Sequence, residues 1–207
     1  FKINRAGLEV TLETIQKFQK KLDNMLIDSK KALLVFAGSL PKGITKEIYK
    51  KLVLSFKREN TLICIDTDIF SKEDLIEISP FVIKPNNIEL SHIAKKELKT
   101  LEEIKKEAKE LSKYVTHVLV SLGKNGLLYT SENQVIHAKS PDVQVKSTVG
   151  AGDTTLAGFL FAVSLNKPIE EAVSFATACG TASVLLEGTA IINKTQANEM
   201  LKLIKFE

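Results

Sequence analysis

The chain has 207 residues, of which 44% are hydrophobic and 26% charged, a composition that suits one α/β domain with an ample core. The net charge is +4, but lysines alternate with glutamates along predicted helices and tryptophan is absent, which disfavours nucleic-acid binding. Apolar runs are too short to span a bilayer and no signal peptide is recognisable, so we expect a cytoplasmic protein without membrane contact, with free buried thiols at Cys64 and Cys179.

Strand-like and helix-like segments alternate along the chain. Uninterrupted apolar runs such as Ala32–Ala37 predict strands buried on both faces, and apolar residues at helical spacing separate them. The predicted strands are Phe1–Asn4, Ala32–Ala37, Thr61–Ile65, Phe81–Ile83, His117–Ser121, the hairpin Leu127–Thr130 with Gln134–Ala138, and Val143–Val149. Three predicted helices start at caps, at Thr11, Thr45 and Thr100. The other predicted helices are Lys72–Ile78, one that contains Glu89 and Leu90, Leu156–Leu165, Pro168–Leu186 and one from Thr195.

This alternation predicts a three-layer α/β fold for residues 1–207, a single domain with a mostly parallel sheet and helices on both faces. Ligands of such sheets bind beyond the carboxyl ends of the strands. The polar or glycine-rich loops all follow strands, at Gly38–Gly43, Asp66–Asp68, Lys84–Asn86, Ser121–Gly126 and Gly150–Asp153. Five such loops on one edge predict a binding site there.

The loop Ser147–Thr155 carries the strongest chemical signal. Gly150 and Gly152 let the backbone approach a ligand closely, and the following helix begins with free N–H groups and a positive dipole end, which favour phosphate. A carboxylate at Asp153 would be repelled by phosphate unless it accepts a proton from the attacking group. Taken alone, the motif more often marks a helix cap.

Together, four loops resemble motifs of the PfkB, or ribokinase-type, carbohydrate kinase family, and most closely its 1-phosphofructokinase and tagatose-6-phosphate kinase branch. They occur in the family's order, and the resemblance extends from Phe1 to the C-terminus. The matching stretches are Gly38-Ser-Leu-Pro-Lys-Gly43, Lys84-Pro-Asn-Asn-Ile-Glu-Leu90, Val120-Ser-Leu-Gly-Lys-Asn-Gly126 and Thr148-Val-Gly-Ala-Gly-Asp153.

The resemblance implies a role for each residue of the glycine loop. Asp153 resembles the catalytic base that takes the proton from the sugar hydroxyl attacking the γ-phosphate of ATP. The N–H groups of Gly150, Ala151 and Gly152 resemble the anion hole. The alternative for Asp153 is a helix cap.

The resemblance also implies an ATP and Mg²⁺ region. Lys84 supplies a cation for phosphate, while Asn86 and Glu89 supply oxygens that hold Mg²⁺ directly or through water. A surface lysine and a solvated helix glutamate are the alternatives. A further ATP-binding loop is implied at Ser121, Leu122, Gly123, Lys124, Asn125 and Gly126, with a plain strand-to-hairpin turn as its alternative.

The resemblance implies that Gly38 and Ser39 contact the substrate, as Asp153 does. Lys42 is a candidate for binding an anion, and Lys2 and Asn4 are candidates for facing the substrate. Solvated loop side chains are the alternative. The small residues of Pro168–Leu186 fit either tight helix packing or a wall of the adenine pocket.

The sequence departs from the family pattern in two ways. The branch commonly has Asp-X-Ser-Gly where this chain has Asp66-Thr-Asp-Ile69, which leaves the contacts of that loop open. Family members also have roughly a hundred further residues at the N-terminus, about the first third of their own length, and this region carries sugar contacts and a lid that often forms a homodimer interface. We therefore expect a C-terminal part of a kinase, without the lid and with little activity of its own.

The leading hypothesis is an ATP- and Mg²⁺-dependent sugar-phosphate kinase that converts fructose 1-phosphate to fructose 1,6-bisphosphate. Tagatose 6-phosphate or another sugar is the alternative substrate. A nucleotide-binding fragment without catalysis is the alternative of another class. An NAD-binding domain is disfavoured, because its Gly-X-Gly-X-X-Gly would follow the first strand, whereas this glycine loop comes late and ends in Asp.

Overall fold

The computed structural model of the chain describes residues 7–207. The predictions for Phe1–Asn4, including Lys2 and Asn4 as substrate-facing residues, lie outside this part. The described helices are α1 (Leu12–Leu26), α2 (Lys46–Ser55), α3 (Lys72–Ile78), α4 (Asn87–Ala94), α5 (Leu101–Leu111), η1 (Gly123–Asn125, a 3₁₀ turn), α6 (Ala151–Ser164), α7 (Ile169–Val184) and α8 (Lys194–Leu201). The described strands are β1 (Ala32–Ala37), β2 (Thr61–Asp66), β3 (Val82–Ile83), β4 (His117–Ser121), β5 (Leu127–Thr130), β6 (Val135–Lys139) and β7 (Lys205–Phe206).

The described strands form one mixed sheet in the order β1-β2-β3-β4-β5-β6-β7. Strands β1 to β4 run parallel and are connected through helices, whereas β5, β6 and β7 pair in antiparallel fashion. Because β6 is antiparallel to β5, which is antiparallel to β4, the carboxyl end of β6 lies at the same edge as those of β1 to β4. The segment that leads to the glycine loop therefore departs from the predicted binding edge.

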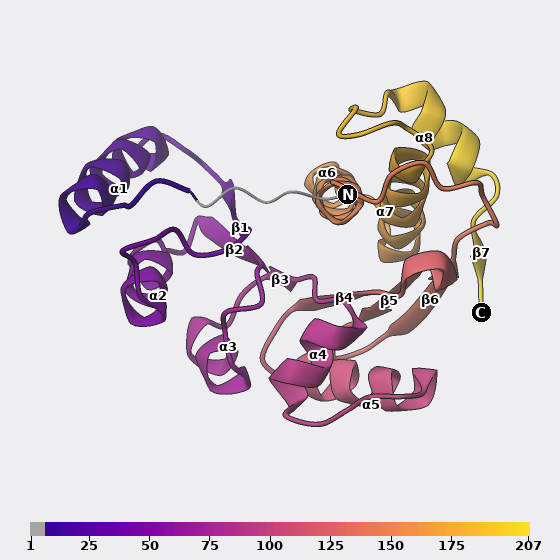
Figure 1. The fold of residues 1–207 in the computed structure, drawn as a ribbon, viewed down its shortest axis with the longest axis horizontal. Coiled ribbons are helices and arrows are strands. Elements are labelled where there is room, and N and C mark those ends of the chain that lie inside the picture. Colours follow the sequence, from indigo (N-terminus) through magenta and orange to yellow (C-terminus); the bar gives the residue numbers. More distant parts are fainter. Residues whose placement is uncertain (1–6) are drawn as a thin grey trace.

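Helices cover both faces of the sheet, as the three-layer prediction requires. One buried cluster joins one face to α2–α5 and to the inner side of α1, and a second joins the opposite face to α6 and α7. The strands supply both clusters through their two-residue period: Ile63 and Ile65 belong to the first, and Cys64 between them to the second. Figure 1 shows α6 and α7 on one side of the sheet, α4 and α5 on the other, and α8 outside α7.

Local capping signals fix most helix starts. The side chains of Thr11 and Thr45 accept N–H groups of the first turns of α1 and α2. Thr100 and Glu103 form the predicted capping box of α5. Each cap satisfies backbone donors that have no partner within the helix, so the boundary is encoded locally.

Two predictions about regular structure are wrong, and one element was missed. Val143–Val149 is not a strand. Instead of pairing with a strand, the N–H groups of Lys146 and Ser147 both donate to the carbonyl of Val184, the last residue of α7. The helix expected from Leu156 begins at Ala151, and the short strand β7 was not anticipated.

Strand β1 was predicted to be buried on both faces, but Val35 is 47% exposed, because β1 is the edge strand of the described sheet.

Cys64 and Cys179 are buried free thiols, as predicted. Within residues 7–207, no helix combines the length and apolar character that crossing a membrane requires.

Candidate functional site

Backbone hydrogen bonds tie neighbouring loops together along the carboxyl edge of the parallel strands. The Gly38 N–H donates to the Asp66 carbonyl at 3.1 Å, and the Lys84 N–H donates to the Ile65 carbonyl at 3.2 Å. The Ser121 N–H donates to the Pro85 carbonyl at 3.0 Å. Four of the five predicted loops thus form one continuous edge, as the parallel topology implies.

The fifth loop delivers the first turn of α6. Gly150 adopts the left-handed conformation with φ of +78°, which glycine tolerates at little cost, and α6 begins at the next residue. The first bond within the helix runs from the Thr154 N–H to the Gly150 carbonyl at 2.9 Å. The N–H groups of Gly152 and Asp153 precede it, while that of Ala151 donates to the Thr148 carbonyl at 3.3 Å. This helix start suits an anion, with Asp153 exposed in its first turn.

A buried ion pair lies beside this turn. The Lys84 ammonium is 3.1 Å from Asp66 Oδ1, and the two side chains are only 7% and 13% exposed. A methyl group added to Gly152 would come within 3.0 Å of the same ammonium nitrogen. The Lys84 ammonium therefore lies directly against the first turn of α6, and its partner Asp66 is a residue to which no motif assigned a role.

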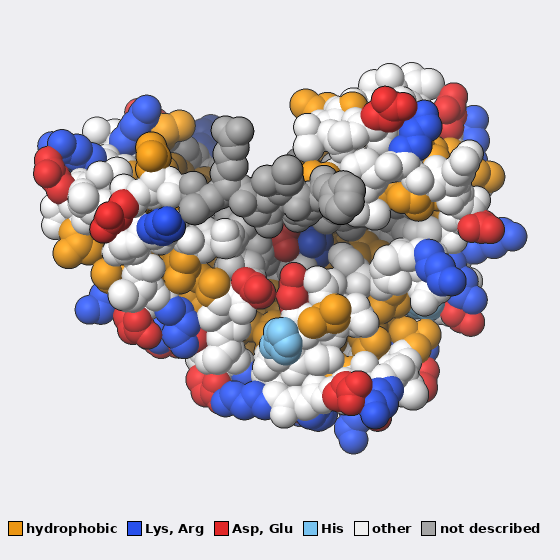
Figure 2. Space-filling view, viewed as in Figure 1, with side chains coloured by type: hydrophobic (Ala, Val, Ile, Leu, Met, Phe, Trp, Pro, Cys, Tyr) orange, Lys and Arg blue, Asp and Glu red, His pale blue; other side chains and the backbone are white. Residues whose placement is uncertain are grey.

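Further carboxylates surround the pair. Burial raises the pKa of Asp66, the Lys84 charge opposes that rise, and the charges of Asp153 and Glu89 add to it. Glu89 and Asp153 are therefore each close enough to Asp66 to interact with it electrostatically. Figure 2 shows acidic and basic side chains at the floor of a hollow between the part of the molecule around α1 and the part around α6–α8.

Asn86 and Glu89 form the capping box of α4. Asn86 Oδ1 accepts the N–H groups of Ile88 and Glu89 at 2.8 and 2.9 Å, and Glu89 Oε2 accepts the Asn86 N–H at 2.8 Å. Their predicted role as metal ligands therefore competes with a structural one, and the second carboxylate oxygen, Oε1 of Glu89, has no part in the box.

No group of three or more His, Cys, Asp or Glu side chains within the described residues forms a metal cage. Mg²⁺ commonly binds through one or two carboxylates, with water and substrate phosphates completing its shell. The oxygens of Asn86 and Glu89 fit such an open Mg²⁺ site, in which water and phosphate supply the remaining ligands, and do not form a closed site made of protein ligands alone.

The predicted ATP-binding loop is a tight, well-anchored turn. Leu122 and Gly126 close it through a 2.9 Å backbone bond, and Gly126 has φ of +92°. His137 Nε2 bonds to the Asn125 carbonyl at 2.9 Å from the neighbouring strand β6. Its residues Ser121 to Gly126 thus hold a fixed shape at the same edge, beside the Lys84–Asn86 loop.

Gly38 and Ser39 lie exposed after β1, as a substrate contact requires, and Lys42 pairs through its backbone with Glu9. These residues reach the edge from the β1 side, whereas Asp153 reaches it from α6. The predicted substrate residues thus approach this edge from two different elements of the fold.

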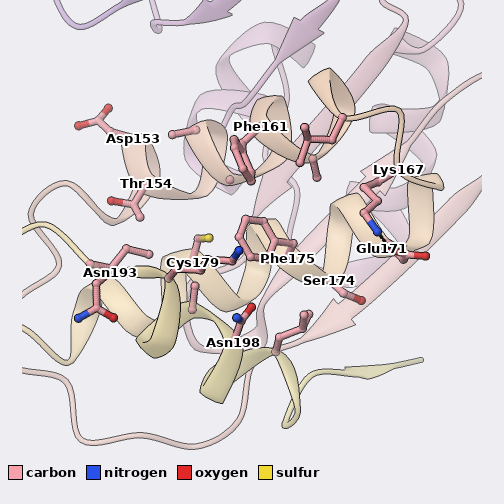
Figure 3. Close-up of a pocket in the computed structure, with 18 of the residues that line it drawn as sticks. Asp153, Thr154, Phe161, Lys167, Glu171, Ser174, Phe175, Cys179, Asn193 and Asn198 are labelled. Carbon is pink, nitrogen blue, oxygen red and sulfur yellow. Dashed lines mark ion pairs between the residues drawn. The ribbon is translucent and has the colours of Figure 1, made fainter.

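An apolar groove of about 1190 Å³ runs between α6, α7 and α8. Asp153 and Thr154 stand at one end of it, and the ion pair between Lys167 and Glu171, 3.1 Å apart, lines another part. Figure 3 shows these residues with Phe161, Phe175 and Cys179 between the helices. The predicted wall at Pro168–Leu186 is α7, whose small residues pack closely on α6: a methyl group at Gly158 would meet Cys179 Sγ at 2.9 Å.

Comparisons with known proteins point to one family. The profile described as pfkB family carbohydrate kinase matches residues 10–196. A curated relative, the 1-phosphofructokinase of Vibrio cholerae, is 33% identical over 98% of this chain and 64% of its own length. The ATP-dependent 6-phosphofructokinase isozyme 2 of Escherichia coli is 30% identical over 84% of this chain and 58% of its own.

Solved structures give the same result. The crystal structure of phosphofructokinase-2 from Escherichia coli in complex with substrates and products superposes with a TM-score of 0.89 and 26% identity, over 98% of this chain and 66% of that one. The chain spans less than two thirds of the length of the curated relatives named above. Since the family profile matches most of its residues, the chain belongs to the pfkB family of carbohydrate kinases.

Proposed function

We propose that this chain carries the phosphate-binding and proton-accepting part of an ATP-dependent kinase whose acceptor is a hydroxyl of fructose 1-phosphate. The observation that carries the proposal is the Lys84 ammonium lying against the first turn of α6, beside the exposed carboxylate of Asp153. Phosphoryl transfer needs donors for the phosphate charge and a base for the attacking hydroxyl, and both are present within this one turn.

In the proposed mechanism, the N–H groups of Gly152 and Asp153 and the Lys84 ammonium hold the phosphoryl oxygens as negative charge develops on them. This set differs from the N–H groups of Gly150, Ala151 and Gly152 that the resemblance implies, because the Ala151 N–H already donates to the Thr148 carbonyl. The Asp153 carboxylate orients the sugar hydroxyl and accepts its proton as the oxygen attacks phosphorus. The Ser121–Gly126 turn supports the rest of the nucleotide. Asn86 and Glu89 are the proposed holders of Mg²⁺, which when bound neutralises charge on the phosphate oxygens.

Fructose 1-phosphate is favoured as the acceptor because the relative at 33% identity is named 1-phosphofructokinase. Fructose 6-phosphate is the second candidate, because a relative at 30% identity is named ATP-dependent 6-phosphofructokinase. Both acceptors give fructose 1,6-bisphosphate, and they differ in which end of the sugar already carries a phosphate and therefore in the hydroxyl that attacks. Comparing them with tagatose 6-phosphate in one ADP-release assay decides the acceptor.

The test of the site is Asp153→Asn, with Glu102→Gln as the matched control. Glu102 is also an acidic residue in the first turn of a helix, but it belongs to α5 on the opposite face of the sheet. A positioned base contributes about 10²- to 10⁴-fold in rate, so we expect even the low turnover predicted for this chain to fall by that factor while ATP binding, measured by calorimetry, persists. Glu102→Gln should leave both unchanged.

Near-normal turnover in Asp153→Asn would contradict the assignment of the base. Mg²⁺-dependent ATP binding without turnover by the unmodified chain would support a nucleotide-binding function alone. Failure of the correctly folded chain to bind ATP would refute the proposal as a whole.

A further inference from the structure

The pairing of Asp66 with Lys84 assigns a role to a carboxylate that the motif comparison left unexplained. We propose that Asp66 is a positioning residue, which holds the Lys84 ammonium against the first turn of α6 so that it faces the phosphates of a bound nucleotide. This inference rests on the proposed function, and it deepens it by naming what keeps the phosphate-binding cation in place.

A cation at this position needs a counter-charge. The first turn of α6 is the positive end of the helix dipole, which repels an ammonium. Lys84 is only 7% exposed, so water does little to offset that repulsion. The Asp66 carboxylate, 3.1 Å from the Lys84 ammonium, supplies the compensating charge. Without this carboxylate the ammonium would be a buried, unpaired charge, and Lys84 would be more stable with its amine turned toward water, away from the site.

The backbone fixes both partners. The Lys84 N–H is bonded to the Ile65 carbonyl at 3.2 Å, and the Asp66 carbonyl accepts the Gly38 N–H at 3.1 Å. Both residues therefore stand at set places on adjacent parallel strands. Surface ion pairs lack such anchoring, and for that reason they contribute little.

The space beside the pair is also specified. Gly152 has no side chain, and a methyl group there would come within 3.0 Å of Lys84 Nζ and 3.7 Å of Cε. The ammonium occupies the room that this glycine leaves, between the carboxylate and the helix start. An anion bound at the N–H groups of Gly152 and Asp153 would thus meet the Lys84 charge at short range.

The chain offers a matched control in Asp74. This carboxylate is also buried and bonds to two lysines, Lys46 and Lys50, each at 2.9 Å. Its partners belong to α2, and Asp74 itself lies in α3, so the cluster joins two helices instead of facing the strand edge. Asp74→Asn therefore removes a buried, lysine-paired carboxylate without touching the candidate site.

The experiment compares the unmodified chain, Asp66→Asn, Asp66→Glu and Asp74→Asn. Binding of ATP with Mg²⁺ is measured by calorimetry, and thermal melting followed by circular dichroism verifies the fold. Because a hydrogen bond to a charged group is at stake, we expect Asp66→Asn to weaken ATP binding by about tenfold, with partial recovery in Asp66→Glu. Asp74→Asn should lower the melting temperature and leave ATP affinity unchanged.

A second measurement needs no nucleotide. Brief acetylation followed by mass spectrometry reports how accessible each lysine amine is. We expect Lys84 to react several-fold faster in Asp66→Asn than in the unmodified chain, because its amine is no longer held inside, while Lys50 reacts at its former rate.

The two measurements separate the two proposals. If the unmodified chain fails to bind ATP, the proposed function is refuted, and labelling of Lys84 still decides whether Asp66 holds it. Unchanged labelling of Lys84 in Asp66→Asn would overturn the inference. Unchanged or tighter ATP binding by that variant would overturn it as well, since removal of a negative charge alone should favour an anion.

Discussion

Acid should destabilise this fold through His117, the first residue of β4. Its Nδ1 lies 2.9 Å from the Tyr129 hydroxyl, and the rings of Phe81 and Phe159 enclose it with centroid distances of 4.7 and 5.5 Å. Burial lowers the pKa of His117 from 6.5 to about 4. The imidazole is therefore neutral in the folded protein under conditions where the unfolded chain already takes up a proton.

The sign and size of the effect follow from this difference. Between pH 6.5 and about 4 the unfolded chain binds more protons at His117 than the folded chain does. The stability contributed by the neutral imidazole is complete above pH 6.5 and is lost as the pH falls toward 4. The difference in pKa corresponds to about 3 kcal/mol, of which about 2 kcal/mol should be lost by pH 4.5.

The assay is urea unfolding at pH 7.5 and pH 4.5 for the unmodified chain, His117→Gln and His92→Gln. Other titrating groups cancel when each variant's loss of unfolding free energy is subtracted from that of the unmodified chain. We expect His117→Gln to be less stable at pH 7.5 but to lose about 2 kcal/mol less on acidification. The exposed His92 should make no difference. Equal acid losses in all three proteins would refute the reasoning.

Two further predictions concern the turn beside the nucleotide and the thiols. Gly126→Ala should destabilise the chain by at least about 2 kcal/mol in urea, because φ is +92° and the new methyl group would overlap the Ala138 carbonyl oxygen; Gly7→Ala, where no atom of the described residues lies within 4 Å of the new methyl group, is the control. Burial raises the pKa of Cys64 to about 12 and that of Cys179 to about 11, so a thiol reagent at pH 8 should react with both only after unfolding, and rapid reaction of the native chain would contradict their burial.

Features set by local chemistry were predictable from the sequence. Strands Ala32–Ala37 and His117–Ser121 and helix Lys72–Ile78 have the predicted bounds, since apolar runs and caps act over a few residues. The family could also be recognised, because its motifs are short, ordered and chemically constrained. The common edge of the loops followed from the parallel topology alone.

Features set by tertiary contacts were not predictable. The residues Gly150–Thr154 have low helix propensity, so the sequence favoured a later start for α6. In the folded chain, the Thr155 hydroxyl bonds to the Ala151 carbonyl at 2.8 Å, and Gly180 of α7 leaves the room that this hydroxyl needs. The helix therefore begins early because its partner helix packs against the first turn.

The partnership between Asp66 and Lys84 could not be derived from the sequence for a related reason. Asp66 ends β2 and Lys84 directly follows β3, so their approach depends on the register between these strands, where Ile65 pairs with Ile83. The available signal was the rule that adjacent parallel strands end at one edge. That rule brings residues into a common region, but it does not choose which carboxylate meets which ammonium.

The charges at this edge lead to a final prediction about ATP binding. Asp66 and Lys84 offset each other, which leaves the carboxylates of Glu89 and Asp153 against about half a positive charge at the start of each of α4 and α6. A polyphosphate entering the site without a metal therefore meets net repulsion, so Mg²⁺ should tighten ATP binding by at least about tenfold.

Salt separates this repulsion from other causes of weak binding. The Debye length falls from about 30 Å at 0.01 M to about 10 Å at 0.1 M, so added salt screens the contact between carboxylate and phosphate. In the presence of EDTA, ATP affinity measured by calorimetry should rise with salt over this range, and Glu89→Gln should reduce that rise. If ATP binds as tightly with EDTA as with Mg²⁺, or if salt weakens metal-free binding, then the carboxylates do not set the field that a phosphate meets at the start of α6.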